Sequence, residues 1–354
     1  MQLHLVSGFL GSGKTTAIAA AARWLMQRGK RVGVVTNDQG RYLVDTAFFR
    51  LGDLPAVEVT GGCFCCNYDD LDARLTQLVE SYAPDVVFAE SVGSCADLVA
   101  TVLKPLLELR HAPASLSVFA DARLLRFRLL GYALPFSDDI LYIFDKQIEE
   151  AGLLVINKAD LLNSDERREV EALAREVYPQ KNVRLQNSLD ESQVAAWVGS
   201  LRANGFAAAA PSPAIDYQRY GQGEAELAWL DQRITLEVKP GQGQAAVVRL
   251  IETILERLAA QDASVAHLKF VLDDGAKISI TAGGETGWRA AVPDLPGQQI
   301  ALLVNARVQT GADLLRAAVA EAAQRVAGMP GVSVVLSPAD AFHPGFPNPT
   351  YRMD

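Results

Sequence analysis

The sequence contains no run of five basic residues and no apolar stretch approaching the ~20 residues that cross a bilayer. Its formal net charge is −9 at pH 7. Binding to nucleic acid or to an anionic membrane depends on clustered Lys and Arg, so we expect neither partner. Met1 leads directly into an apolar stretch without the basic region or cleavage site of a signal peptide. The expected location is therefore the cytoplasm.

Cysteine is also scarce, with four residues in a chain of 354. All four lie within the first hundred residues, at Cys63, Cys65, Cys66 and Cys95. A disulfide scaffold would spread its cysteines over a small secreted domain, which this chain is not. Clustered thiols in a reducing compartment are typical of metal ligands or redox groups.

Apolar runs of strand type alternate with amphipathic helical patterns through the first two hundred residues. This alternation predicts an α/β fold with a doubly wound, mainly parallel sheet, which binds ligands beyond the carboxyl ends of its strands. The expected strands are Leu3–Val6, Arg31–Thr36, Ala56–Thr60, Asp85–Ala89, Leu116–Ala120, Leu153–Ile156 and Val183–Leu185.

A change of composition marks the end of this first domain. The stretch Ala207–Pro213 reads AAAAPSP and is typical of a linker. The pattern beyond it predicts a smaller α+β domain, and the last residues contain several prolines that exclude a regular helix. We therefore expect a P-loop domain at 1–205, a linker at 206–225, a small α+β domain at 226–336 and a proline-rich tail at 337–354.

A phosphate-binding loop follows the first expected strand. Residues 8–15 match the pattern G-x-x-x-x-G-K-[ST] between a strand and a helix. The glycines let backbone N–H groups turn toward a phosphate at the N-terminus of the helix. Lys14 is expected to reach the β- and γ-phosphates, and Thr15 to ligate Mg²⁺. The nucleotide contacts expected from this loop come from Gly8, Gly11, Ser12, Gly13, Lys14, Thr15 and Thr16.

The run Asn157-Lys158-Ala-Asp160 follows a later strand and is typical of a guanine-reading element. Asp160 can accept hydrogen bonds from guanine N1–H and its amine, which adenine does not offer in that pattern. The alternative is a helix N-terminus capped by Asp160. Ser188, after the next strand, is expected to add a contact to the base. The sequence thus predicts GTP as the nucleotide.

Two further strand ends carry carboxylates. Glu90 ends a strand and can hold Mg²⁺, while Gly93 lets the following backbone approach the γ-phosphate. Asp38 follows the second strand and can sense Mg²⁺, a bound metal or the attacking water. The alternative for Glu90 is a surface glutamate without a ligand, and the alternative for Asp38 is a simple turn. Lys14, Thr15, Glu90 and Asp38 are the catalytic candidates, and no residue is assigned as the general base.

Three thiols lie within four residues in the run Gly61-Gly62-Cys63-Phe64-Cys65-Cys66. Two glycines allow the loop to bring the sulfurs together, and Zn²⁺ favours tetrahedral thiolate coordination. Co²⁺, Fe²⁺ and Cu⁺ are further candidate metals. Buried structural thiols and a redox pair are the alternatives. Cys95 is the candidate fourth ligand, against the alternative of a buried or helix-capping residue.

Together these motifs resemble the CobW-like metallochaperone P-loop GTPases, relatives of HypB and UreG. The matching runs are GFLGSGKTT at 8–16, NDQG at 37–40 with Asp45 beyond it, GGCFCC at 61–66, ESVG at 90–93 and NKAD at 157–160. The resemblance implies GTP hydrolysis coupled to holding Zn²⁺, or a related metal, and delivering it to a client protein. It also implies that two copies can pair as a homodimer.

The sequence departs from the family pattern in three places. Asp38 stands where the family usually has Glu, Val92 lacks the hydroxyl usual at its position, and the histidine-rich loop of many members is absent. The residues 91–98 and the tail resemble a branch associated with corrinoid-dependent methyl transfer. One alternative function is therefore a GTPase chaperone for a corrinoid- or other cofactor-dependent enzyme, with a structural metal. Another is a small-molecule kinase that uses the phosphate-binding loop to phosphorylate its substrate.

Overall fold

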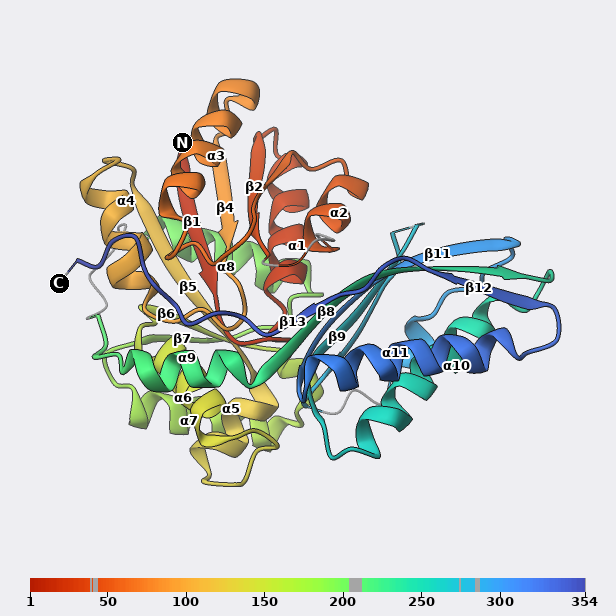
Figure 1. Cartoon of the computed structure of the whole chain (residues 1–354). Helices are drawn as coiled ribbons and strands as arrows, with labels where there is room; N and C mark the ends of the chain where they lie inside the picture. Colours follow the sequence, from red (N-terminus) through yellow and green to blue (C-terminus); the bar gives the residue numbers. More distant parts are fainter. Residues whose placement is uncertain (39, 41–43, 204–211, 274, 284–286, 354) are drawn as a thin grey trace. The chain divides into compact units, whose positions relative to one another are not determined.

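The computed structural model describes residues 1–38, 40, 44–203, 212–273, 275–283 and 287–353, and the chain forms two compact units (Figure 1). The N-terminal unit comprises Met1–Gln39, Phe49–Gly223 and Phe346–Asp354. The C-terminal unit comprises Gly40–Phe48 and Glu224–Gly345. Two short segments therefore belong to the unit that their position in the chain would not suggest.

The sheet of the N-terminal unit has seven parallel strands among the described residues, in the order β3-β2-β4-β1-β5-β6-β7. Parallel strands are buried on both faces and read as nearly continuous apolar runs, which is why the sequence located them. The expected doubly wound α/β fold is confirmed. The strands are β1 Gln2–Ser7, β2 Val32–Asn37, β3 Ala56–Val59, β4 Val86–Glu90, β5 Ala114–Asp121, β6 Leu153–Asn157 and β7 Asn182–Leu185.

Helices cover both faces of this sheet (Figure 1). Local chemistry fixes some of their ends: Asn163 caps α7 in a reciprocal capping box with Glu166. The helical elements are α1 Lys14–Met26, α2 Val44–Leu51, α3 Tyr68–Tyr82, the π-helix Val99–Leu103, α4 Lys104–Glu108, α5 Ala122–Leu129, α6 Asp138–Glu149, the 3₁₀ turn Ala159–Leu161, α7 Ser164–Val177, α8 Glu191–Ala203 and α9 Tyr217–Ala225.

Trp197 on α8 illustrates how the helices are held against the sheet. Its side chain is fully buried, and its ring packs edge-on against Phe119 of β5. The indole Nε1–H donates to the Ser117 hydroxyl at 3.1 Å. Burying one such ring stabilises the fold by about 2–3 kcal/mol, and its polar atom is satisfied.

The C-terminal unit has a separate antiparallel sheet in the order β10-β9-β11-β8-β12, with β13 also paired to β8. Even-numbered residues of β8 and β11, such as Leu230 and Val304, join the apolar core with α10 and α11. Odd-numbered residues therefore lie on the opposite face. The elements are β8 Leu227–Val238, α10 Gly243–Ala259, β9 Ser264–Leu272, β10 Lys277–Thr281, the 3₁₀ turn Trp288–Ala291, β11 Gln299–Gln309, α11 Ala312–Ala327, β12 Val332–Leu336 and β13 Asp340–Phe342.

The stretch expected as a linker at 206–225 is not irregular throughout. Residues 204–211, which carry most of its alanine-rich part, lie outside the described residues. Its last residues form α9, because Tyr220 packs with Ala96 and Ile143 and accepts the Ala96 N–H on its hydroxyl at 3.0 Å. In the tail, Asp340–Phe342 forms β13 between Pro338 and Pro344.

Candidate nucleotide-binding and metal-binding site

The loop after β1 has the geometry of a phosphate cradle. Gly8, Gly11 and Gly13 all have positive φ, and α1 begins at Lys14. A Cβ at Gly8 would lie 2.0 Å from the Phe119 carbonyl oxygen, and one at Gly13 would lie 2.4 Å from the Asn157 side chain. Only glycine fits these two positions. The loop therefore presents its backbone to a ligand at the N-terminus of a helix.

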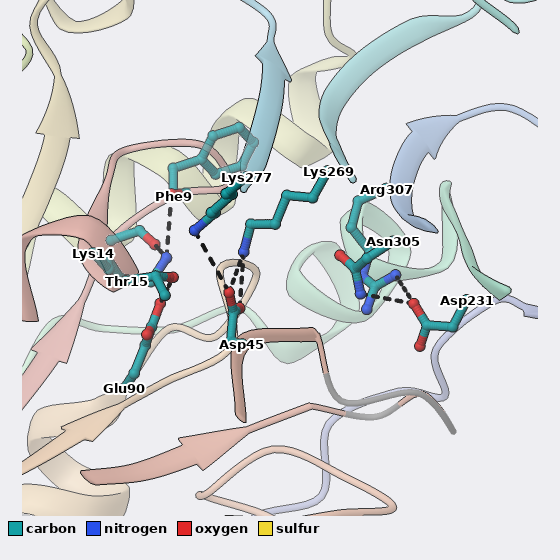
Figure 2. A network of polar contacts seen from close by, with 11 residues as sticks. Phe9, Lys14, Thr15, Asp45, Glu90, Asp231, Lys269, Lys277, Asn305 and Arg307 are labelled. Carbon is teal, nitrogen blue, oxygen red and sulfur yellow. Dashed lines mark hydrogen bonds and ion pairs between the residues drawn. The ribbon is translucent and has the colours of Figure 1, made fainter. Parts of the chain in front are cut away.

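Lys14 and Thr15, at the first turn of α1, are both buried (Figure 2). The Lys14 ammonium donates to the Gly8 carbonyl at 2.6 Å. The Thr15 hydroxyl donates to Glu90 Oε1 at 2.8 Å. Glu90 ends β4, the strand directly paired to β1, so the register brings this carboxylate to the loop. A hydroxyl and a carboxylate in contact form a donor set that suits Mg²⁺.

The structure places the other expected loop residues around this pair. Ser12 is buried, and Thr16 is partly exposed on α1. A Cβ at Gly93 would lie 3.0 Å from Leu10 Cα, so the backbone after Glu90 passes directly against the phosphate-binding loop. Gly93 thus links the carboxylate of β4 to the loop that follows it.

The Asn157-Lys-Ala-Asp160 element is tied to the phosphate-binding loop by its own side chain. Asn157 donates to the Ser12 carbonyl at 2.8 Å and accepts the Ser188 hydroxyl at 2.7 Å. Lys158 adopts a left-handed backbone conformation, and Asp160 is exposed. Asn157 therefore braces the loops, while Asp160 is accessible to a base.

Asn37, at the end of β2, connects that strand to the cysteine loop. Its amide nitrogen donates to Gly62 O at 2.8 Å and to Val59 O at 3.2 Å. Its amide oxygen accepts the Phe64 N–H at 2.9 Å. One side chain thus holds both sides of the loop that carries the thiols. The neighbouring Asp38 donates its backbone N–H to Val59 O at 3.3 Å.

The chain that follows Asn37 and Asp38 enters the C-terminal unit at Gly40. Asp45 accepts two hydrogen bonds of 2.8 Å from the Lys269 ammonium, and Lys277 lies 3.9 Å away (Figure 2). A Cβ at Gly40 would lie 1.5 Å from Asp231 Oδ2, so a larger residue there would displace the Asp231 carboxylate. The segment that follows β2 is therefore bound to the polar face of the antiparallel sheet.

Three sulfurs converge at the start of α3. The Cys63 sulfur lies 2.8 Å from that of Cys65 and 3.1 Å from that of Cys66, and the last two are 3.8 Å apart. No cysteine is in a disulfide. Cys95 lies 3.7 Å from Cys65 and is outside the group of three that are mutually close. The three loop cysteines are thus brought together, and Cys95 lies beside Cys65.

These distances fit a thiolate metal site. Four sulfurs at about 2.3 Å from a tetrahedral Zn²⁺ lie about 3.8 Å from one another. The Cys65–Cys66 and Cys65–Cys95 separations match this value, and the Cys63 sulfur needs only a small outward shift. Hydrogen bonding to Cys63 raises the pKa of Cys66 to about 11, and the pKa of Cys65 is raised by the same partner. A metal that binds here has to displace thiol protons.

Gln147 on α6 holds the loop that carries Cys95. Its amide nitrogen donates to the carbonyl oxygens of Gly93 at 3.0 Å and Cys95 at 2.8 Å. One buried side chain therefore holds, at two points, the backbone that follows Glu90 and carries Cys95. Sequence reasoning missed Gln147, because a glutamine in an amphipathic helix is ordinary.

Two buried acidic residues, Asp97 and Glu150, follow Cys95 in the chain and the end of α6, respectively. Asp97 Oδ2 accepts the Tyr217 hydroxyl at 2.7 Å and Arg352 Nε at 2.9 Å. Glu150 accepts the Val99 N–H at 3.2 Å, and burial raises its pKa to about 8. Burial also raises the pKa of Asp97, against the lowering effect of Tyr217 and Arg352. These residues were also missed, although charges in an apolar stretch are a signal of structural or functional use.

The fold and the loops define a P-loop nucleotide-binding protein with a thiol cluster on the same sheet. The match to a family model covers residues 2–184 and is described as the CobW/HypB/UreG nucleotide-binding domain. This chain belongs to the CobW/HypB/UreG family, which confirms the resemblance seen in the sequence. Among the described residues, no helix is long and apolar enough to cross a membrane.

Two curated relatives each match a little under half of this chain. The zinc chaperone CobW of Sinorhizobium sp is 30% identical over 185 residues, 45% of this chain and 51% of that protein. The zinc chaperone YeiR of Escherichia coli (strain K12) is 30% identical over 164 residues, 44% of this chain and 46% of that protein. The chain spans about half the length of these relatives. HypB from Helicobacter pylori, solved in complex with nickel, aligns with a TM-score of 0.43 at 17% identity over 58% of this chain and 90% of that chain.

Proposed function

We propose that this protein is a GTP-hydrolysing metallochaperone. It binds Zn²⁺ or a related transition metal at Cys63, Cys65 and Cys66, and it couples its nucleotide state to delivery of the metal to a client protein. Two curated relatives are named zinc chaperones, and the sulfur geometry suits a thiolate metal.

The observation that carries the coupling is the set of hydrogen bonds made by Asn37. This residue holds Gly62 and Phe64 of the cysteine loop, and it begins the segment that continues to Gly40 and Asp45. A change in the backbone beyond β2 would therefore reach the thiols directly. Gln147 supplies a second link, between Gly93 and Cys95.

In the nucleotide half, Lys14 and the loop amides would hold the phosphates, and Asp160 would read guanine with support from Lys158 and Ser188. Thr15 and Glu90 would hold Mg²⁺, which neutralises charge on the β- and γ-phosphate oxygens when bound. The Thr15–Glu90 hydrogen bond holds both ligands at the mouth of the loop. Asp38 is retained as the candidate that senses the metal ion or positions water.

Coupling requires that the metal binds one nucleotide state more tightly than the other. A typical link of this kind is worth about 1–3 kcal/mol, or about 5–150-fold in affinity. The direct test measures Zn²⁺ affinity of the protein bound to GDP and to a non-hydrolysable GTP analogue. Equal affinities in the two states would contradict the coupling.

A second measurement separates the metal from the nucleotide. Apo-protein is titrated with Zn²⁺ and with Co²⁺ while GTP turnover is followed, for the native chain and for the Cys63/Cys65/Cys66→Ser variant. We expect metal to change turnover in the native chain only, with GDP affinity equal in both proteins. Cys95→Ser tests the fourth ligand, since its loss should weaken binding and shift the Co²⁺ spectrum.

One result would favour the alternative of a chaperone for a corrinoid- or other cofactor-dependent enzyme. In that case the metal would be stoichiometric, would resist strong chelators and would leave GTP turnover unchanged. The metal would then serve the fold, and the client would be the cofactor enzyme.

A further inference from the structure

The last residues of the chain return to the N-terminal unit and contact the cysteine loop. The Thr350 N–H donates to the Cys65 carbonyl at 2.8 Å, and the Thr350 hydroxyl donates to the Cys66 carbonyl at 3.0 Å. The Asn348 N–H donates to the Cys66 sulfur at 3.2 Å. The tail thus bonds the backbone of two thiol residues and the sulfur of one.

Contacts on both sides of these bonds hold the segment in place. Beyond the cysteines, Arg352 pairs with the buried Asp97 at 2.9 Å, and the Met353 N–H donates to the Ala100 carbonyl at 2.9 Å. Before them, the Phe346 ring lies against Gly221, where a Cβ would come within 2.0 Å of it. Both ends of the segment are therefore anchored on the N-terminal unit.

Two prolines in the segment determine which of its N–H groups can reach the cysteine loop. Pro347 and Pro349 have no N–H group and favour an extended backbone. The residues between and after them, Asn348 and Thr350, are those whose N–H groups reach the cysteine loop. In an extended chain, alternate residues point to the same side. The sequence P-N-P-T therefore directs its available donors toward the thiols.

We propose that residues 346–353 are a working part of the metal site, a strap that positions Cys65 and Cys66 and must lift for an ion to enter or leave. An N–H donated to a thiolate sulfur orients the ligand and tunes its hold on the metal. The side chains of Asn348, Thr350 and Arg352 are at least partly exposed, so the strap is a surface element that can be displaced. The assignment rests on the proposed metal site.

The first test uses apo-protein and does not depend on any metal. The rate at which a thiol reagent labels each cysteine is followed by mass spectrometry in the native chain, in a chain that ends at Gly345 and in Arg352→Ala. Loss of the strap should speed labelling of Cys66 about tenfold, because local opening controls access to protected groups. Arg352→Ala should give a smaller increase, and Arg352→Lys should restore slow labelling.

The matched control is Arg168→Ala, which removes an exposed arginine–aspartate pair on α7. Its labelling rates should equal those of the native chain. Cooperative thermal unfolding of each variant shows that it is folded, and the point variants answer the question if the shortened chain is not. Unchanged Cys66 labelling in a folded shortened chain would overturn the proposal.

The second test follows transfer of Zn²⁺ alone from the loaded protein to a chromophoric chelator, together with the absorption spectrum of the Co²⁺ form. We expect faster transfer and an altered Co²⁺ spectrum without the strap. Transfer at the native rate with an unchanged spectrum would overturn it. A third outcome is faster labelling of Cys66 without the strap in a protein whose native form binds no metal. That outcome would show that the strap covers the thiols, and it would refute the proposed metal function instead.

Discussion

The phosphate-binding loop and the cysteine loop follow strands of the same parallel sheet, but they are held in different ways. The first is supported by the neighbouring strand ends: three glycines turn it, Thr15 bonds Glu90 at the end of β4, and Asn157 at the end of β6 bonds Ser12. The second is supported by distant parts of the chain, namely Asn37 from the end of β2 and the strap from the C-terminus. The phosphate-binding loop is thus held by the ends of neighbouring strands, whereas the cysteine loop is also held by a segment from the far end of the chain.

The contrast has a physical basis in the ligands. A phosphate needs a fixed set of N–H donors, because preorganised dipoles give the greatest stabilisation. A metal that is to be delivered needs a site that can change its hold on the ion. In the proposed function, Asn37 and the strap would supply that freedom, and the nucleotide pocket would respond to the metal in turn.

The largest effect on GTP turnover should come from a change in the phosphate-binding loop. Replacing Lys14 with Ala removes the charge that the loop directs at the phosphates. GTP turnover should fall about 10²–10³-fold, as when a donor to the developing charge is removed. Zn²⁺ stoichiometry should be unchanged, because the thiols have their own supports. Lys30→Ala, an exposed lysine, is the control, and loss of bound Zn²⁺ along with turnover would show that the cysteine loop needs Lys14 for its structure.

Base recognition should be the next most sensitive feature. Asp160→Asn replaces an acceptor of two hydrogen bonds and should weaken GTP binding about 10²-fold, because a polar group of the base is left unpaired. Binding of the xanthine nucleotide should improve, since its second carbonyl can accept from the new amide. The affinities are measured by isothermal titration with Asp165→Asn as the exposed control. GTP affinity within twofold of the native value would exclude this role.

Removing the support at Asn37 should affect the metal and spare the nucleotide. Asn37→Ala loses the bonds to Gly62 and Phe64. The difference in Zn²⁺ affinity between the GDP and GTP-analogue forms should shrink about tenfold, within the usual range of such couplings. Nucleotide affinity itself should change little. Asn182→Ala, an exposed residue of β7, is the matched control, and a preserved difference would mean that coupling runs by another route.

The smallest effect concerns stability and pH. Burial raises the pKa of Glu150 to about 8, so the folded state favours the protonated acid. Its contribution is complete below the ordinary pKa of the unfolded chain and is lost as pH rises through about 8. Glu150→Gln keeps an acceptor for Val99 and should stabilise the protein by on the order of 1–2 kcal/mol at pH 8, and little at pH 5. Urea unfolding at both pH values measures this, with Glu149→Gln as the control. A benefit that is equal at both pH values would argue against a buried neutral acid.

The same contrast explains what could be predicted from the sequence. Residues 8–16 and 61–66 are continuous, so their glycines, lysine and thiols could be recognised together, and the strands stood out as apolar runs. The partners Arg352 and Asp97 are 255 residues apart, and Tyr217 lies 120 residues from Asp97. Nothing local in a single sequence pairs such residues. Asn37 was recognised as part of a motif, but its hold on Gly62 depends on the register of β2 beside β3.

The segment after β2 shows a further limit. Asp45 was recognised only as part of the family pattern beyond residues 37–40, and the structure pairs it with Lys269 of the antiparallel sheet. An ion pair between helix α2 and a distant strand depends on how the whole chain folds, which no periodicity encodes. The close approach of Gly40 to Asp231 becomes clear only in the same way.

The prolines of the strap also bear on solubility. A released chain end with a full row of N–H and C=O groups can add to the open edge of a sheet, in its own molecule or in another. Pro347 and Pro349 leave such a segment with donors on one side only, so it cannot extend a sheet as a central strand. If this segment paired with a sheet edge through Asn348 and Thr350, its prolines would face outward, so a further strand could not hydrogen-bond to it there.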